Sequence, residues 1–175
     1  MNRILFDRFY SAGLLDSRRA EYLWMPEMDF FPPVDGGGNY AGLTAFAATG
    51  KSDLFCWDAG DRVWLVPPDH SEPVLYALNL RDAIYRRLLE FMSNAFGNIC
   101  TDEVKRRMPT DTVAISQSEA LAMLKEYEQG FADLLLPEQL DVLRTLRRGG
   151  FDRSGVLLTG EACGALISVL LEQAQ

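Results

Sequence analysis

The chain has 175 residues, of which 48% are hydrophobic and 24% charged, ordinary proportions for a soluble globular protein with one sizeable core. Its net charge of −8 argues against nucleic-acid binding, which needs a basic surface. No apolar run approaches the roughly 18 residues of a membrane span. Asp7 and Arg8 interrupt the N-terminal apolar cluster, which argues against a secretory signal, so a cytoplasmic location is expected.

The N-terminal third predicts one helix followed by extended chain. Residues 4–15 have the apolar spacing of a helix. Residues 21–33 are aromatic-rich but interrupted by prolines, which favours two extended pieces joined by a turn. Gly36-Gly37-Gly38 predicts a flexible connection. It does not fit a phosphate-binding loop, because no strand precedes it and the next lysine is Lys51.

The middle of the chain, residues 42–92, organises the predicted fold. Four short apolar runs predict an antiparallel meander, because Gly- or Pro-containing turns separate them: 43–48, 54–58, 63–66 and 74–78. From Leu80 the apolar period becomes helical, and Asn79 is the predicted N-cap. We expect this helix to cover one face of the sheet.

The C-terminal third predicts three helices. Residues 101–112 are polar and suggest a solvated turn or helix end around Lys105–Arg107. Ser116 with Glu119 matches a capping box, Pro137 suits a first helical turn, and a last helix begins near Thr159. The predicted class is α+β, with a small antiparallel sheet packed against helices and additional C-terminal helices. We expect an α+β unit over residues 1–110 and a helical extension over 111–175 on the same core.

Catalytic and metal-binding patterns are weak. The single histidine, His70, lies in a proline-flanked turn, and nothing in the spacing brings a cysteine to it. Cys56, Cys100 and Cys163 are odd in number and widely spaced, which predicts reduced thiols without a disulfide framework. Asp53, Asp58 and Asp61 lack the register of a calcium loop. We therefore expect no cofactor, no metal and no catalytic residue.

Acidic residues are concentrated around the predicted turns. Residues 27–72 contain eight carboxylates against Lys51 and Arg62. One interpretation is that these acids are simply solvated turn residues, which are commonly Asp. The other is that they form an acidic face for a basic protein partner. Both interpretations stay open. The second interpretation selects the turn carboxylates Asp58, Asp61, Asp69 and Glu72.

Aromatic residues near these turns are the candidate anchors of such an interface. They are Trp24, Phe30, Phe31, Tyr40 and Trp64. Aromatic density of this kind is also typical of a buried core, and both interpretations remain open.

The stretch from Gly50 to Met92 resembles the SUKH superfamily, also called the Smi/Knr-like family. The resemblance is carried by residues in the predicted strands, the Gly turn, the following polar turn and the helix: Asp53, Leu54, Phe55, Trp57, Gly60, Val63, Trp64, Asp69, His70 and Leu80–Met92. It implies a curved antiparallel sheet with helices against it. Many bacterial members are thought to be immunity proteins that neutralise toxins, often basic nucleases, of contact-dependent or polymorphic toxin systems.

Two functions of different classes follow. One is a non-enzymatic protein-binding module, specifically an immunity protein that neutralises a cognate toxin. The other is a small enzyme or ligand-binding protein that uses carboxylates or a thiol on the concave face of the sheet. The sequence does not fix the oligomeric state, the partner or the role of the C-terminal helices.

Overall fold

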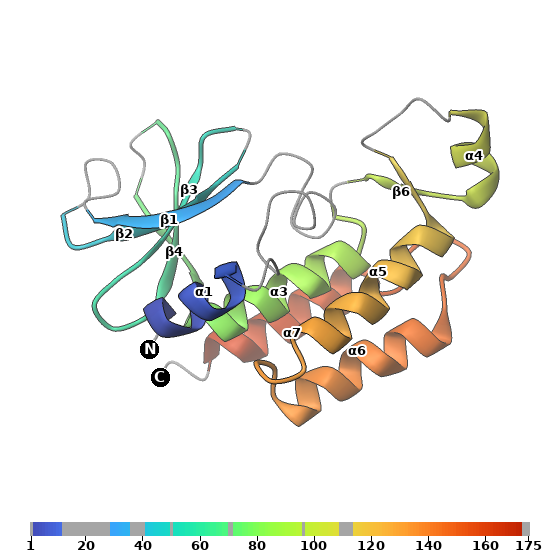
Figure 1. Ribbon diagram of the computed structural model, residues 1–175. Coiled ribbons are helices and arrows are strands. Elements are labelled where there is room, and N and C mark those ends of the chain that lie inside the picture. The colour runs from blue at the N-terminus through green and yellow to red at the C-terminus, as the bar shows by residue number, and fades with distance from the viewer. Residues whose placement is uncertain are drawn as a thin grey trace. The chain divides into compact units, whose positions relative to one another are not determined.

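The computed structural model describes residues 2–11, 29–35, 41–49, 51–69, 72–95, 97–108 and 114–172. Within these ranges a five-stranded antiparallel sheet is combined with six helices, which confirms the predicted α+β class (Figure 1). The chain divides into two compact units, Met1–Arg86 with Ser168–Gln175 and Arg87–Ile167.

The sheet of the first unit is a simple meander. Its strands follow sequence order: β1 (Asp29–Asp35), β2 (Thr44–Ala48), β3 (Leu54–Trp57), β4 (Val63–Val66) and β5 (Val74–Ala77). All neighbouring pairs are antiparallel. The four predicted strands are thus confirmed to within one residue at each end, because each run ends at a turn that Gly, Pro or Asp imposes.

One face of the sheet carries an aromatic core. Phe6 of α1 (Asn2–Ser11) is fully buried, and its ring centroid lies 5.8 Å from Phe46 and 5.7 Å from Trp57. Phe46 and Trp57 stack with centroids 4.8 Å apart, and Phe55 meets Tyr76 edge-on. These contacts fix α1 on the sheet through large buried rings.

Both edge strands carry residues that hinder hydrogen bonding to a further strand. Pro32 and Pro33 in β1 lack the N–H groups that a neighbouring strand would need. At the other edge, Arg86 donates a 2.8 Å hydrogen bond to the carbonyl of Tyr76 and lies 4.0 Å above the Tyr76 ring centroid. Such devices limit edge-to-edge association.

Helix α3 (Leu80–Met92) begins at the predicted residue. Asn79 Oδ1 accepts from the Asp82 N–H, and Asn79 Nδ2 donates to Asp82 Oδ2, so Asn79 caps the helix as expected. The apolar residues Ile84, Leu88 and Phe91 are all buried.

The second unit is mainly helical. Its further elements are β6 (Ile99–Cys100), α4 (Asp102–Arg107), β7 (Ile115–Ser116), α5 (Gln117–Gly130), α6 (Pro137–Gly149) and α7 (Gly160–Glu172), the last of which ends in the first unit. The three predicted C-terminal helices are confirmed, and Ser116 and Glu119 form the predicted capping box. Whether these helices share one core with residues 1–110 stays a prediction.

Helix α4 and the short parallel pair β6–β7 were not predicted. The two strands are too short to show a period, and α4 buries none of its residues. Polar contacts hold α4 instead: Thr101 caps it, and Asp102 accepts from both the backbone N–H and the hydroxyl of Ser118 in α5.

Asn2 joins three elements of the first unit. Its backbone N–H donates to Asp61 Oδ1, its Nδ2 donates to the Asp61 carbonyl, and its Oδ1 accepts from the Leu80 N–H. Asn2 is fully buried. It therefore links the start of α1, the β3–β4 turn and the first turn of α3.

Replacing Asn2 by Ala should lower the free energy of unfolding by about 1 to 3 kcal/mol, because the buried Leu80 N–H loses its acceptor. Urea unfolding measures the change. The matched control is Arg3→Ala, whose exposed side chain makes an ion pair with the exposed Asp7 and whose loss should cost less than about 0.5 kcal/mol. Equal stabilities of the two variants would contradict the role assigned to Asn2.

Candidate functional site

The four predicted turn carboxylates lie at opposite ends of the sheet. Asp58 and Asp61 belong to the β3–β4 turn, beside the ends of β3 and the start of β4. Asp69 and Glu72 belong to the β4–β5 connection, beside the other end of the same strands. Antiparallel strands of four residues separate these ends by about 13 Å. The structure therefore brings the carboxylates together in two pairs and not in one cluster.

Asp58 organises the β3–β4 turn. Its Oδ1 accepts from the backbone N–H groups of Gly60 and Arg62, at 2.8 and 3.0 Å. Its Oδ2 accepts from Arg62 Nε at 2.8 Å and from the Trp64 indole N–H at 3.0 Å. Partial burial opposes ionisation, but the bonds from Trp64, Arg62 and Gly60 outweigh it, so the pKa of Asp58 lies below its usual value.

Asp61 completes the same turn with a left-handed backbone, at φ 67°. This conformation is uncommon for a residue with a Cβ, although Asp tolerates it better than most. Burial acts to raise the pKa of Asp61, and the hydrogen bond from the Asn2 N–H lowers it below its usual value. Both acids of this pair therefore have internal structural roles.

Asp69 and Glu72 are exposed, in a connection that also contains Pro67, Pro68 and Pro73. Prolines fix φ and reduce the conformational entropy that a loop loses when it binds. Of the four predicted carboxylates, these two can contact a partner without breaking the bonds that hold the β3–β4 turn.

The predicted aromatic anchors have different positions. Phe31 and Trp64 are half-buried residues of β1 and β4. Phe30 lies in β1, but its side chain is outside the described residues, as are Trp24 and Tyr40. The guanidinium of Arg62 lies 5.3 Å above the Trp64 ring centroid. Trp64 is therefore held by Asp58 at its indole N–H and by Arg62 over its face.

Among the residues considered for chemistry, the cysteine in β3 is unfavourably placed for nucleophilic attack. Cys56 is buried, and burial raises the pKa of its thiol to about 11, which disfavours the nucleophilic thiolate. His70 lies outside the described residues. Across the described ranges, no group of three or more His, Cys, Asp and Glu side chains could hold a metal ion.

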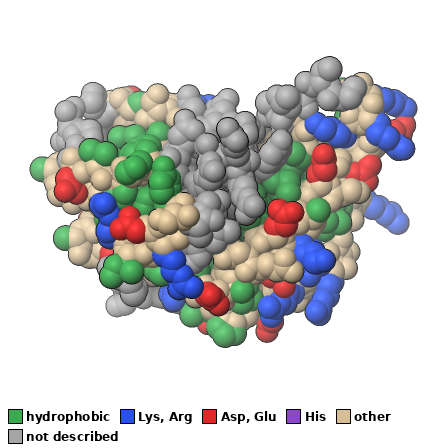
Figure 2. Space-filling view, viewed as in Figure 1, with side chains coloured by type: hydrophobic (Ala, Val, Ile, Leu, Met, Phe, Trp, Pro, Cys, Tyr) green, Lys and Arg blue, Asp and Glu red, His purple; other side chains and the backbone are tan. Residues whose placement is uncertain are grey.

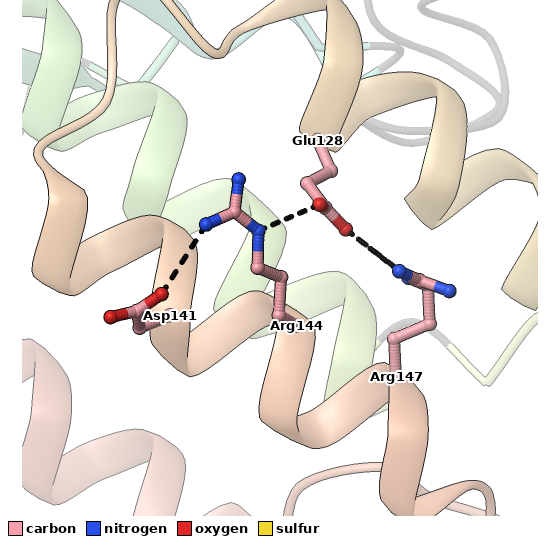
Figure 3. Close-up of polar contacts among 4 residues, drawn as sticks. All are labelled: Glu128, Asp141, Arg144 and Arg147. Carbon is pink, nitrogen blue, oxygen red and sulfur yellow. Dashed lines mark hydrogen bonds and ion pairs between the residues drawn. The ribbon is translucent and has the colours of Figure 1, made fainter.

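A second charged cluster, which sequence reasoning missed, lies between α5 and α6 (Figure 3). Glu128 accepts from Arg144 Nε at 2.8 Å and from Arg147 Nη2 at 3.1 Å, and Arg144 also contacts Asp141. The hydrogen bonds from Arg144 and Arg147 overcome the effect of burial and lower the pKa of Glu128. The i, i+3 spacing of the two arginines was a signal, but it did not identify the partner. These contacts join α5 to α6.

Comparison with known proteins adds no assignment. No family model, curated protein or solved structure matches the chain. The resemblance to the SUKH superfamily therefore stays an expectation. Within the described part of the chain, no helix is long and apolar enough to cross a membrane.

Replacing Asp58 by Asn should lower the free energy of unfolding near neutral pH by about 1 to 3 kcal/mol, because the amide nitrogen that replaces Oδ2 is a donor and can accept from neither Trp64 nor Arg62. A carboxyl group with a lowered folded-state pKa stabilises above its unfolded pKa, and this stabilisation is lost as pH falls through the folded pKa. The difference between wild type and Asp58→Asn should therefore stay constant from about pH 7 to about pH 5 and shrink below about pH 4.

The matched control is Glu72→Gln, an exposed carboxyl in the next connection, which should leave the free energy of unfolding nearly unchanged at each pH. Urea unfolding across the pH series distinguishes the two. Indistinguishable profiles for the two variants would show that Asp58 does not stabilise the turn.

Proposed function

We propose that this protein is a non-enzymatic, cytoplasmic protein-binding module, specifically a bacterial immunity protein that binds and neutralises a cognate toxin with a basic surface. The observation that carries the proposal is a small sheet that has carboxylates beside both ends of its strands. The β3–β4 turn is fixed by Asp58, and Thr49 bonds to Asp53 across the β2–β3 turn at 3.0 Å.

Rigidity supports a binding role because a surface that is already ordered loses little entropy on association. The β3–β4 turn is held by the strands on either side of it and by the hydrogen bonds that Asp58 accepts. Recognition residues are often found on loops that a rigid scaffold positions.

Charge supports a basic partner. Between residues 30 and 77 the chain has six carboxylates, Asp35, Asp53, Asp58, Asp61, Asp69 and Glu72, and two cations, Lys51 and Arg62. A field of one sign raises the rate at which an oppositely charged protein is encountered, and the effect falls as salt shortens the Debye length from about 10 Å at 0.1 M.

The resemblance to the SUKH superfamily supports the more specific part of the proposal. Toxins neutralised by such immunity proteins are often basic nucleases, and a basic nuclease surface complements the acidic turns. A protein that neutralises a toxin by covering its surface needs no reactive residue of its own. The buried, protonated thiol of Cys56 agrees with such a role.

Reversing Asp69 and Glu72 to Lys should slow association with a toxin domain encoded beside this protein by about tenfold or more at low salt, while the dissociation rate changes less. The reason is that both side chains are exposed and act through long-range attraction. Stopped-flow association and surface-bound dissociation at two salt concentrations measure the effect.

The control is a double reversal of Glu126 and Glu161, which are exposed helix residues of the second unit, and it changes net charge by the same amount. The proposal requires a smaller effect from this control. Rates that depend on neither salt nor the Asp69 and Glu72 reversals would overturn the acidic-face argument, and absence of binding to the toxin domain would overturn the immunity function.

A further inference from the structure

Helix α4 has no buried face. None of its six residues is buried, and even its apolar residue Val104 and the adjoining Met108 are 42% and 45% exposed. Figure 2 shows charged side chains gathered at the surface over α4. Most surface helices of a folded protein are stabilised by an apolar stripe that packs on the core. The attachment of α4 depends instead on hydrogen bonds.

Two of these hydrogen bonds join the start of α4 to the first turn of α5. Asp102, the first residue of α4, accepts from the Ser118 backbone N–H at 3.1 Å through Oδ1 and from the Ser118 hydroxyl at 2.7 Å through Oδ2. Asp102 and Ser118 are both exposed. We call this pair the Asp102–Ser118 latch. Water can replace both of its hydrogen bonds, so opening the latch costs far less free energy than opening a buried core.

Lys105 provides a further polar contact of α4. Its Nζ donates to the carbonyl of Ala114, the residue before β7. The lysine side chain is a flexible four-carbon stem, and its ammonium group is strongly hydrated. This contact can therefore also be exchanged for water when α4 moves.

The strands on either side of α4 are anchored by bonds in which α4 takes no part. Asn94 Oδ1 accepts from the Ile99 N–H, and Asn94 Nδ2 donates to the Ile99 carbonyl. The Ile115 N–H donates to the Asn98 carbonyl. Ile99 and Ile115 are only 6% and 2% exposed. The pair β6–β7 can therefore stay closed while α4 leaves α5.

The first turn of α5 is also capped without help from α4. Ser116 Oγ accepts from the Glu119 N–H at 3.1 Å, and the Ser116 N–H donates to the Glu119 carboxylate at 2.7 Å. These reciprocal bonds satisfy backbone groups at the helix start whether or not Asp102 is in place. Release of Asp102 therefore does not require α5 to unwind.

We propose that α4 is a strap that opens from α5 as one unit while the rest of the second unit stays folded, and that the Asp102–Ser118 latch holds it closed. Local opening of this kind is typical of elements with few buried apolar contacts. Opening frees the carboxylate of Asp102 and the hydroxyl and N–H of Ser118. This device does not involve the acidic turns and goes beyond the proposed function.

The test is residue-resolved amide hydrogen exchange of the full chain near neutral pH, in a series of low urea concentrations. The amides of residues 105–107 should share one opening free energy and exchange at least about a hundredfold faster than those of the buried residues Leu124 in α5 and Leu143 in α6. Their exchange should be nearly independent of urea, because the opening of a helix without buried residues exposes little new surface.

Two serine variants test the latch. Ser118→Ala removes the hydroxyl donor to Asp102 and should speed exchange of residues 105–107 by about fivefold, the effect of one exposed hydrogen bond. The matched control is Ser154→Ala, which removes an exposed hydroxyl that donates to Asp152 within its own turn. It should leave exchange of residues 105–107 unchanged.

Three results would overturn the proposal. If residues 105–107 had the same opening free energy and urea dependence as Leu124, α4 would open only in global unfolding. If the amides of Ile99 and Ile115 exchanged together with α4, the strands would not stay closed. If Ser118→Ala and Ser154→Ala had equal effects on residues 105–107, the Asp102–Ser118 pair would not be the latch.

Discussion

The hydrogen bonding of Asp58 is the constraint on which the β3–β4 hairpin depends. One carboxylate accepts four donors from Gly60, Arg62 and Trp64, and so closes the turn, orients the indole and positions the guanidinium. The left-handed residue Asp61 follows and bonds to Asn2, which in turn accepts from the first N–H of α3. A local turn is thereby connected to the first turns of α1 and α3.

Because Asp58 and Asp61 hold the β3–β4 turn, the acidic residues of this region do not act as one cluster. In the sequence the carboxylates of residues 53–72 form one group, but in the sheet they separate into two ends. The pair at one end is occupied by structural hydrogen bonds, whereas Asp69 and Glu72 at the other are exposed. Contact with a partner is therefore expected mainly at the end of the strands that carries Asp69 and Glu72.

Local signals in the sequence predicted the elements well where the physical cause is local. Gly, Pro and Asp turns defined strands β2 to β5, and the Ser116–Glu119 capping box and Pro137 defined the starts of α5 and α6. Helix α4 was not predicted, because it is stabilised by polar contacts and not by an apolar stripe. The hydrogen bonds from Asn2 to Asp61 and from Arg144 to Glu128 could not be predicted, because the partners are 59 and 16 residues apart in the sequence.

The sequence predicted which residues lie in strands and turns, but not how their side chains contact one another. It placed Trp64 in a strand and the four carboxylates in turns, where the structure also has them. It could not show that Trp64 and Asp58 are bonded, or how the strands pair, because register depends on bulges near Val34, Ala45 and Val63. Only the paired strands place these side chains together.

Hydrogen–deuterium exchange of the full chain, with and without a toxin domain encoded beside it, tests the central claim that the sheet unit is a recognition surface. The account predicts that binding slows exchange in peptides from residues 29–77, most strongly around β4 and the β4–β5 connection. Slowed exchange confined to residues 114–167, or no change on adding the toxin domain, would contradict it.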